Sequence, residues 1–592
     1  MTTVDWVIVA LTLLGASGVG MWFTKRASKS AEDFFVGGRG VPWWLAGTSI
    51  LATSFASDTP LHTTRLFRAH GMAAGWFYWN GILSMIVIAF FFSRLWRRTG
   101  VVTDNELMEF RYAGKGAAVL RGGMAIYKTF LLEMITLGWV ILGMTKIVKV
   151  IMDLPDTVML PLVGAVPAEY AVVAVLLVVT VVYSSASGIW GVVTADFLEF
   201  AIAMIGAITL GFVAMSKVGG PSGLRDALAQ SSLGPRALEF MPSFDGEHFT
   251  LLMFGGWMGI QWWANTGVDG SGHRAQRFLS CKDEGHAIAS GIWSLAVQWL
   301  IRSWPWYIAA LASIVLYPNV EDGESVYPLM VRELLPVGLR GLMVASFISA
   351  FVSTVVSHYN LTASYLVNDV YRRFLVKKES PKHYVRASRV TTILVAIISG
   401  TIAISLPSVL AAFWFKMEIM AGLGLVYVLR WFWWRVNAKT EIAALLTSVV
   451  VALYLHYSPA WAGGEAQGAI IRLMLVAFTS GTVALLVAWL SKPEPMEHLV
   501  LFYRRVAPPG WWGPVAEAAG GKVPSEFGWE TVAQMLVSLV FVFSGMFALG
   551  KFLLGEPWLG LGLGVVAVIS GYTIVRWVFH GRVSHETPTP AE

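Results

Sequence analysis

Residues 42–63 read PWWLAGTSILATSFASDTPLHT, which is long enough for a transmembrane helix but not uniformly apolar. Pro60 removes a backbone donor and disfavours the helical conformation for Thr59. Asp58 places a carboxylate in the bilayer, at a cost of at least about 2.5 kcal/mol on insertion scales. A kink with a capped second half is one interpretation. The carboxylate favours the other, an unwound helix whose freed carbonyls bind a cation.

The composition of the whole chain indicates that lipid is its solvent. Of 592 residues, 56% are hydrophobic and only 14% are Asp, Glu, Lys or Arg. A soluble chain of this composition would expose very large apolar patches, which excludes a soluble enzyme, a nucleic-acid binder and a disordered scaffold. The net charge of +6 fits basic cytoplasmic loops rather than nucleic-acid binding. With Cys281 as the single cysteine, an intramolecular disulfide and a cysteine metal cluster are impossible.

Apolar runs predict about fifteen membrane-spanning helices, each near the roughly 20 residues that a bilayer requires. The first is interpreted as a retained span rather than a signal peptide, because no basic segment precedes it and no convincing cleavage site follows it. The predicted spans are 5–23, 42–63, 72–96, 121–149, 170–185, 189–215, 249–267, 286–316, 337–369, 388–406, 408–431, 440–456, 469–490, 530–553 and 557–579.

The loops between these spans predict the orientation. Basic residues gather in every second loop, most strongly in 372–386, and acidic residues occupy two of the intervening ones. The positive-inside rule then places the N-terminus outside and the C-terminus in the cytoplasm of a plasma (inner) membrane. Arg65 and Arg68 break the pattern, as anion-attracting or snorkelling side chains at the outer mouth. The apolar, basic and Trp-rich connection 491–529 is expected to lie on the cytoplasmic membrane surface.

A second irregular helix is expected five spans after the first if the chain contains inverted repeats. The span at that place, 249–267, is rich in glycine and ends in polar and aromatic groups. Close helix packing through glycine is the alternative explanation. The polar and aromatic side chains that this span offers to a solute are Gln261, Trp262, Trp263 and Asn265.

The span 337–369 carries small and hydroxylated residues at three- and four-residue spacing, hence on one helix face. Such a stripe usually mediates close helix packing. Next to the carbonyls of a broken helix, its hydroxyls would also supply the hard oxygen ligands of an alkali cation. The stripe consists of Ser346, Ser349, Ala350, Ser353, Thr354 and Ser357.

Several motifs together resemble the sodium/solute symporter family over roughly residues 5–490. They are DFFVGGRGVPWWLAG (33–47), ATSFASDT (52–59), QRFLSCKDE (276–284), GLMVA (341–345), AFVST (350–354) and NDVYRRF (368–374). The resemblance implies an all-α polytopic membrane protein with LeuT-like inverted five-helix repeats, one extra N-terminal helix and about four C-terminal helices. The expected parts are 1–41 (extra helix and basic loop), 42–248 and 249–437 (the two repeats), 438–490 (two accessory helices), 491–529 (interfacial segment) and 530–592 (two helices and tail).

The resemblance also implies a sodium site between the first and eighth core helices. Its ligands would be the carbonyls of Ala56, Thr59 and Ala350 and the hydroxyls of Ser353 and Thr354. Asp58 would favour sodium as a nearby charge without necessarily ligating it. Some family members bind a second sodium. Asp196 and Ser357 fit that site, whereas Val356 stands where a further hydroxyl is wanted.

Charged residues inside the predicted spans are the remaining candidates for substrate binding. They are Glu133, Arg302, Lys416 and Glu418. Charges buried in a membrane either pair with one another or serve a transport pathway. A cavity that offers both signs slightly favours a zwitterion or organic anion over a sugar, although amino acids, sugars and carboxylates all remain open.

These features predict a sodium-coupled symporter that imports a small polar organic solute by alternating access. Its partners would be the solute, sodium and the bilayer, with no nucleic acid and no organic cofactor; the oligomeric state is unknown. A proton-coupled or sodium-independent transporter of the same fold is the alternative. An intramembrane acyltransferase with His358 or His62 as base is a weaker one, since no nucleophile or acyl-carrier motif accompanies them. A sensor that binds the solute without moving it is a third class.

Overall fold

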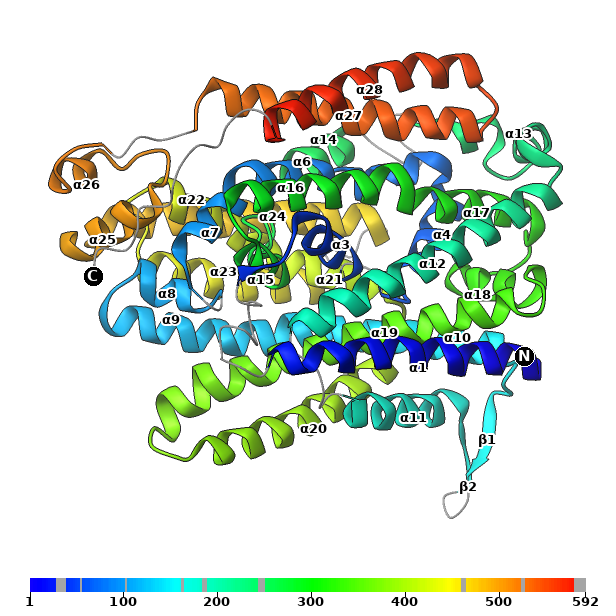
Figure 1. The fold of residues 1–592 in the computed structure, drawn as a ribbon, viewed down its shortest axis with the longest axis horizontal. Coiled ribbons are helices and arrows are strands. Elements are labelled where there is room, and N and C mark those ends of the chain that lie inside the picture. The colour runs from blue at the N-terminus through cyan, green and yellow to red at the C-terminus, as the bar shows by residue number, and fades with distance from the viewer. Residues whose placement is uncertain are drawn as a thin grey trace.

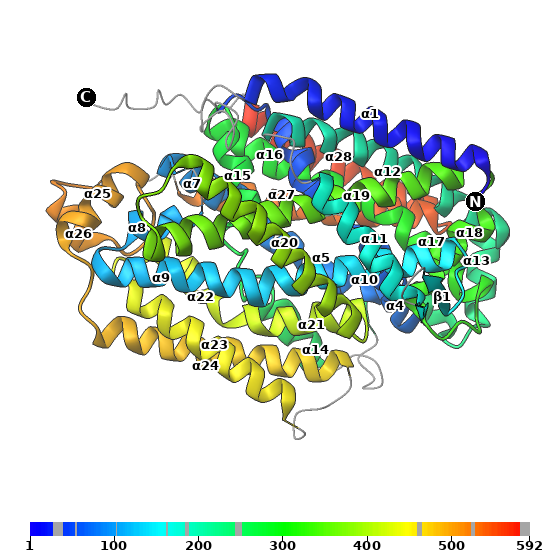
Figure 2. The same cartoon turned by 90° about the horizontal axis from the view of Figure 1, so that it is seen from below.

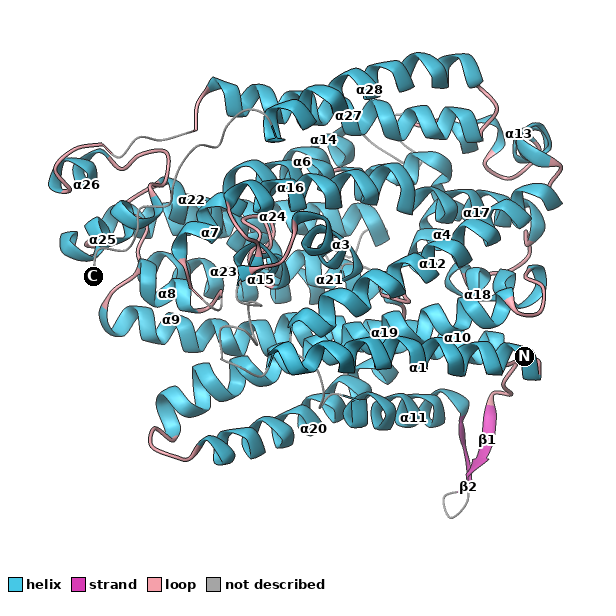
Figure 3. Ribbon diagram, viewed as in Figure 1, coloured by secondary structure: helices cyan, strands magenta, loops and turns pink. Residues whose placement is uncertain are grey.

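The computed structural model describes residues 1–27, 39–53, 56–101, 104–160, 164–183, 189–242, 251–458, 465–522 and 527–579. Helices make up nearly all of this part of the chain, and a short antiparallel hairpin of β1 and β2 protrudes beside the N-terminus (Figures 1 and 3). Most of the predicted loop after the first helix, and part of its motif at 33–38, lie outside the described residues.

The first half of the chain contains the first broken helix. Its elements are α1 (Thr3–Ala27), α3 (Trp43–Thr53), α4 (Thr59–His70), η2 (Gly71–Gly75), α5 (Trp76–Trp79), α6 (Gly81–Val87), η3 (Ile88–Phe92), α7 (Ser93–Thr99), α8 (Glu106–Arg111), α9 (Gly114–Tyr127), η4 (Lys128–Glu133), α10 (Met134–Ile151), β1 (Thr157–Leu160), β2 (Gly164–Pro167), α11 (Ala168–Tyr183) and α12 (Ile189–Lys217).

The following segment contains the second broken helix. It comprises α13 (Gly220–Ala229), η5 (Gly234–Leu238), α14 (Leu251–Ile260), α15 (His273–Ser280), α16 (Glu284–Ala296), η6 (Val297–Arg302), α17 (Ser303–Leu316), α18 (Gly323–Leu334), α19 (Leu339–Ser364), η7 (Tyr365–Leu375), α20 (Pro381–Ser405), α21 (Val409–Met420), η8 (Ala421–Leu423) and α22 (Gly424–Phe432). The remaining helices are α23 (Ala438–Tyr457), α24 (Glu465–Leu490), α25 (Met496–Val506), α26 (Gly513–Ala518), α27 (Trp529–Leu553) and α28 (Pro557–Phe579).

Eleven helical stretches among the described residues are long and apolar enough to cross a membrane. Two shorter apolar helices, Thr3–Gly15 and Ala168–Val181, add to them, and each broken helix supplies two half-helices. The helices follow the predicted spans closely, and the chain is a multi-pass membrane protein.

The first break separates α3 from α4. Asp58 is the N-terminal capping residue of α4, and Pro60 lies in its first turn. The backbone N–H groups in the first turn of a helix have no intrahelical acceptor, so a proline there loses no hydrogen bond. Pro60 therefore starts a new half-helix instead of kinking a continuous one.

The second break separates α14 from α15, as expected from repeat symmetry. Residues 261–272 are not helical, and both Gly270 and Gly272 have positive φ, at 78° and 76°. The helix is therefore broken after Ile260, while Gly256 of α14 still allows close packing, since an added Cβ there would lie 2.6 Å from Met474 Sδ. The described part of the chain thus contains two interrupted helices, α3–α4 and α14–α15.

The helix pairs outside this centre cover separate sides of it (Figures 1 and 2). The α23–α24 pair packs on α21 and η8, whereas the α27–α28 pair packs through α27 on α6 and η6. α1 lies along α12 and α19. α12 in turn packs against both α3 and α19, which brings the first half-helix, the fifth core helix and the eighth core helix together.

The connection 491–529 packs on the protein through α25 and α26. Phe502 and Trp512 are buried, and the Arg111 guanidinium lies 5.3 and 4.9 Å from their ring centroids. The apolar side chains that suggested membrane contact are thus largely covered by protein, while Trp511 and Leu501 remain exposed.

Candidate functional site

Asp196 of α12 lies where α3, α12, α15 and α19 meet. Its carboxylate accepts hydrogen bonds from Ser49 Oγ of α3 at 2.6 Å and from Ser353 Oγ of α19 at 3.2 Å. Arg277 Nη2 of α15 lies 3.8 Å from the same carboxylate, and its Nε donates to Ser49 Oγ at 3.1 Å. Asp196 and Arg277 are only 1% and 2% exposed, so the four side chains form one buried polar cluster.

This cluster joins residues that the sequence assigned to two separate sodium sites. Ser353 was expected at the first site and Asp196 at the second, yet they are hydrogen-bonded to each other. Ala350 and Thr354 are buried on the same helix, and Ser357 is half-buried. Glu199, one turn after Asp196, also interacts with Ser353. Oxygen atoms from α12 and α19 therefore gather at one place, as binding of an alkali cation requires.

The first break supplies further oxygen atoms. The Ala56 carbonyl accepts a backbone hydrogen bond from Thr59 N at 3.2 Å, and the Asp58 carbonyl accepts from Leu61 N and His62 N. The C-terminal end of α3 and the N-terminal end of α4 face this gap. A helix C-terminus carries partial negative charge, which favours a cation.

Asp58 is buried, with 4% exposure. Its Oδ2 lies 3.9 Å from His62 Nε2, and its Oδ1 has no hydrogen-bond partner among the described residues. His62 in turn contacts the Tyr78 hydroxyl at 2.5 Å through Nδ1. An unsatisfied carboxylate oxygen in a membrane protein is costly, so it is a suitable binding group for a transported cation or a polar solute.

Gly143 of α10 allows Asp58 to lie where it does. A Cβ atom at Gly143 would stand 2.7 Å from the Asp58 Cβ and 3.0 Å from its Cα, which is closer than carbon atoms can approach. The absence of a side chain on α10 therefore sets the position of the carboxylate.

Substitution of Gly143 by alanine is expected to displace Asp58 and to lower solute uptake at least about fivefold, because an added methyl in a packed interior costs about 1–3 kcal/mol. Gly123→Ala is the matched control on the same continuous helix, since a Cβ there meets nothing within 4 Å. Radiolabelled uptake into proteoliposomes measures both variants. Equal uptake by the two would contradict the role of Gly143.

The link after α14 holds the four predicted solute residues, two of which face neighbouring helices. Gln261 accepts from Asn80 Nδ2 at 3.1 Å and contacts Met417 Sδ at 3.2 Å. The Trp262 carbonyl accepts a hydrogen bond from Ser84 Oγ. The Gln261 amide thus connects α14 to the helices on both sides and lies between them.

Asn265 and Trp263 contact the chain of the break itself. Asn265 Nδ2 donates to the carbonyls of Gln261 and Trp262 at 3.2 and 3.4 Å, and its Oδ1 accepts from Gly267 N at 2.9 Å. Trp263 Nε1 donates to the Gly259 carbonyl at 2.8 Å. Asn265 therefore satisfies the backbone groups that the unwound helix frees.

Lys416 of α21 is directed toward the first repeat. Its Nζ donates to Thr136 Oγ1 at 2.6 Å and lies 4.8 Å from the centroid of the Trp139 ring. It also interacts electrostatically with both Glu133 and Asp58. Lys416 thus lies over an aromatic face and in the electric field of two carboxylates.

Arg302 and Glu418 contact the framework. Arg302 Nη1 donates to the Leu51 carbonyl in the last turn of α3 at 3.0 Å, which satisfies a free carbonyl of the half-helix. Glu418 accepts from Arg472 Nε of α24 at 2.9 Å and lies 3.0 Å from His456 of α23. The Glu418 carboxylate thus connects α21 to the accessory helices, away from Lys416 and Asp58.

Arg65 and Arg68, which broke the charge pattern, lie in the second half of α4. Arg68 donates to the carbonyls of Ser313 and Tyr317 at 2.7 and 2.8 Å, and Arg65 lies 3.5 Å from the buried carboxylate of Glu324. Both arginines line an open pocket of about 1040 Å³. Arg68 thus satisfies backbone carbonyls at the C-terminal end of α17, and Arg65 connects α4 to α18.

Sequence reasoning missed Ser49, Arg277 and Glu199. Arg277 belongs to the motif 276–284, in the predicted loop between the spans 249–267 and 286–316, but its side chain is buried in the half-helix α15. Its partner Ser49 lies 228 positions away in the chain. The one available signal was that Arg277 follows the second break directly, where a half-helix is expected.

Two interrupted helices that meet at a buried polar cluster are typical of a secondary transporter of the LeuT-like type. The profile of the sodium:solute symporter family matches residues 34–448, and the chain belongs to this family. Sodium-coupled solute symport is the activity of the family, and it agrees with the geometry of the site.

Relatives and one solved structure extend the comparison. The chain is 24% identical to a sodium/glucose cotransporter of Vibrio parahaemolyticus, over 78% of this chain and 86% of the relative. It is 25% identical to sodium/glucose cotransporter 4 of Danio rerio, over 84% and 80%. A Na+-coupled sialic acid symporter, solved in a substrate-bound outward-open state, matches 83% of this chain and 99% of its own with a TM-score of 0.65 and 20% identity. The last comparison supports the fold.

Proposed function

We propose that the protein imports a small polar organic solute together with sodium, and that sodium binds between the first break and α19. The carbonyls of Ala56, Thr59 and Ala350 and the hydroxyls of Ser353 and Thr354 are the proposed ligands. The observation that carries the proposal is the hydrogen bond between Ser353 and the buried Asp196 carboxylate, next to the open end of α3. It provides negative charge and oxygen atoms at the same place.

Asp196 and Ser357 are the proposed ligands of a second sodium. Asp196 is already held by Ser49 and Arg277, so a sodium there would compete with the Arg277 guanidinium for the carboxylate. Val356 offers no oxygen on its side chain, which limits the ligand set from α19. These contacts favour one tightly bound, coupled sodium ion and a second sodium ion that binds more weakly.

The solute is proposed to lie between Asp58, Lys416 and the amide of Gln261. Lys416 would hold an anionic group, while Asp58, Tyr78 and Gln261 would hold amine or hydroxyl groups. Relatives are named for glucose, mannose and myo-inositol, and the solved structure for sialic acid, a carboxylated sugar. A hydroxylated organic acid or a zwitterion satisfies both signs of the cavity. Trp262, Trp263 and Asn265 would shape its second wall.

Transport then proceeds by movement of the broken helices against α10 and α19, which exposes the site first to one side and then to the other. The proposed orientation has the N-terminus outside a plasma (inner) membrane and the C-terminus in the cytoplasm. The proposed organisation keeps the two repeats at 42–248 and 249–437, flanked by α1, the α23–α24 pair and the α27–α28 pair.

Asp58→Asn is expected to raise the sodium concentration for half-maximal uptake in proteoliposomes about tenfold. The substitution removes the negative charge of the buried Asp58 carboxylate, whose Oδ1 has no hydrogen-bond partner among the described residues. A thermal-shift screen of hydroxy acids, sugars and amino acids, with and without sodium, first identifies the solute. Uptake that persists in the wild type without sodium, but needs a proton gradient, would contradict sodium coupling. The Asp58–His62 pair would then be the candidate proton carrier.

A further inference from the structure

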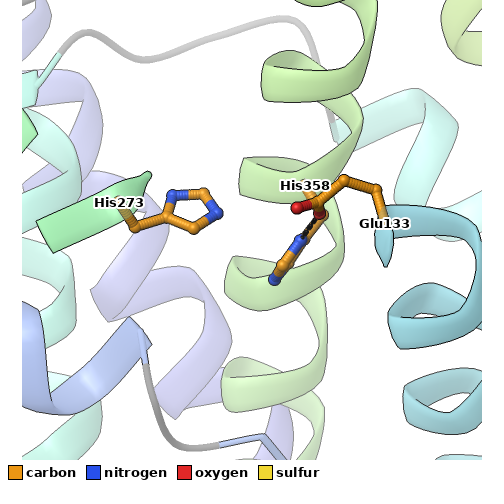
Figure 4. A group of neighbouring side chains, drawn as sticks. All are labelled: Glu133, His273 and His358. Atoms are coloured by element: carbon orange, nitrogen blue, oxygen red, sulfur yellow. Dashed lines mark hydrogen bonds and ion pairs between the residues drawn. The ribbon is translucent and has the colours of Figure 1, made fainter. Parts of the chain in front are cut away.

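Three potential metal ligands converge near the middle of the helix bundle, outside the proposed sodium site. Glu133 ends η4 inside the continuous helix 114–151, His358 lies on α19 one turn after Thr354, and His273 is the first residue of α15. One ligand atom from each lies within 4.8 Å of the other two. Figure 4 shows the His273 ring turned toward the Glu133 carboxylate and the His358 ring.

A direct contact accounts for two of these side chains but not for the third. His358 Nδ1 contacts Glu133 Oε2 directly. The His273 ring lies 4.9 Å from the His358 ring, between centroids, at an interplanar angle of 69°. His273 Nε2 is buried and has no hydrogen-bond partner among the described residues. A buried polar atom without a partner indicates a missing ligand, since such groups are otherwise satisfied.

We propose that Glu133, His273 and His358 bind a divalent transition metal ion, and that Zn²⁺ fits the site best. Two imidazole nitrogens and one carboxylate, with a fourth position left to water, form a common open zinc coordination set. Ca²⁺ and Mg²⁺ require six or more oxygen ligands and a higher negative charge, which this trio does not supply. Lys416 also acts on Glu133 as a positive charge, which further disfavours ions that bind through charge alone.

The geometry needs only a small adjustment to hold the ion. Ligand atoms on one tetrahedral zinc, at about 2.0–2.1 Å from the metal, lie about 3.3 Å apart. The His273 side chain, whose Nε2 has no hydrogen-bond partner among the described residues, would rotate toward the other two ligands, and the His358–Glu133 contact would open to admit the ion.

Bound zinc would connect three helices that alternating access must separate. Glu133 and His358 belong to the third and eighth core helices, whereas His273 begins the half-helix α15 of the sixth. A ligand that binds one conformation better than another shifts the population toward it. This step rests on the proposed transport function: zinc would stabilise the present arrangement of α15 and thereby inhibit uptake.

Binding is tested first on the purified, metal-free full-length protein in detergent, with Zn²⁺ by calorimetry and with Co²⁺ by its visible absorption. We expect one high-affinity ion per chain and an X-ray absorption spectrum with two imidazole ligands. His273→Gln should weaken binding at least about tenfold while leaving the Glu133–His358 contact intact, and His358→Gln should weaken binding by a similar factor. His286→Gln, at a partly exposed histidine paired with Asp283, is the control and should leave the affinity unchanged.

Affinity that is equal in the wild type and in both site variants would overturn the metal site, as would the absence of stoichiometric binding. Thermal unfolding of each variant without metal verifies that it is folded. Uptake then tests the conformational step: micromolar Zn²⁺ should inhibit the wild type but not His273→Gln. If zinc bound through His273 without inhibiting uptake, the inference that zinc stabilises the present arrangement of α15 would be overturned. If the metal-free protein showed no sodium-driven uptake, the proposed transport function would be overturned instead. The metal site would still stand, because the binding measurements do not depend on transport.

Discussion

Replacing Ser353 and Thr354 together by alanine is expected to raise the sodium concentration for half-maximal uptake by more than about a hundredfold. Each hydroxyl is a proposed sodium ligand, and losing a hydrogen-bonding or ligating oxygen next to a charge costs about 1.5–3 kcal/mol. Two such losses correspond to two or more factors of ten in affinity. Ser353 also holds Asp196, so the variant frees a carboxylate oxygen that the alanine methyl cannot satisfy.

Sodium titration of uptake in proteoliposomes measures this effect, with thermal unfolding as a check of folding. Ser346→Ala is the matched control, since Ser346 lies on the same helix, is buried, and its Oγ has no hydrogen-bond partner among the described residues. Its removal should leave the sodium dependence within about twofold of the wild type. If the sodium concentration for half-maximal uptake rose equally in the control and in the double variant, the hydroxyl stripe of α19 would serve helix packing alone.

Asp269→Asn is expected to destabilise the protein by about 3–5 kcal/mol. Asp269 lies in the link between α14 and α15, and its carboxylate accepts from Arg430 and, at 2.9 Å, from Trp431 Nε1. Arg430 and Asp269 are 1% and 0% exposed. Breaking a buried pair from one side leaves an uncompensated charge, which accounts for the size of the loss. The nearest other carboxylate, Glu441, lies 3.5 Å from Arg430 and already accepts from Tyr112.

Thermal unfolding in detergent measures this destabilisation as a lower midpoint. Glu556→Gln is the matched control, because the Glu556–Lys551 pair at 2.9 Å has a carboxylate side chain that is 42% exposed. An exposed pair is worth at most about 1 kcal/mol, so its loss should barely move the midpoint. If Asp269→Asn unfolded at the wild-type midpoint, the contacts of Asp269 with Arg430 and Trp431 would not be what holds the α14–α15 link in place.

Much of the architecture could be predicted from the sequence, because hydropathy and helix-breaking residues are local. The apolar runs located the helices, and Asp58 with Pro60 located the first break. The second break followed from symmetry and from the glycine-rich run, and the structure places it after Ile260. Membrane solvation makes such local signals strong, since each unpaired backbone group in lipid is costly.

The partners of the charged residues could not be predicted in the same way. The sequence offered Glu133 as a substrate or ion-pair residue, but its partner, His358, lies 225 positions away. Likewise Glu418 contacts Arg472 and His456 on the accessory helices. Spacing within one helix shows which residues share a face but not which other helix that face meets.

The sequence by itself determined the class of the protein and its two broken helices, because composition and backbone propensity act over a few residues. Only the tertiary structure decided that Ser353, Asp196, Ser49 and Arg277 form one cluster, and that His273 reaches Glu133 and His358. Those contacts depend on how α12, α15 and α19 cross, which is set by packing summed over many distant residues.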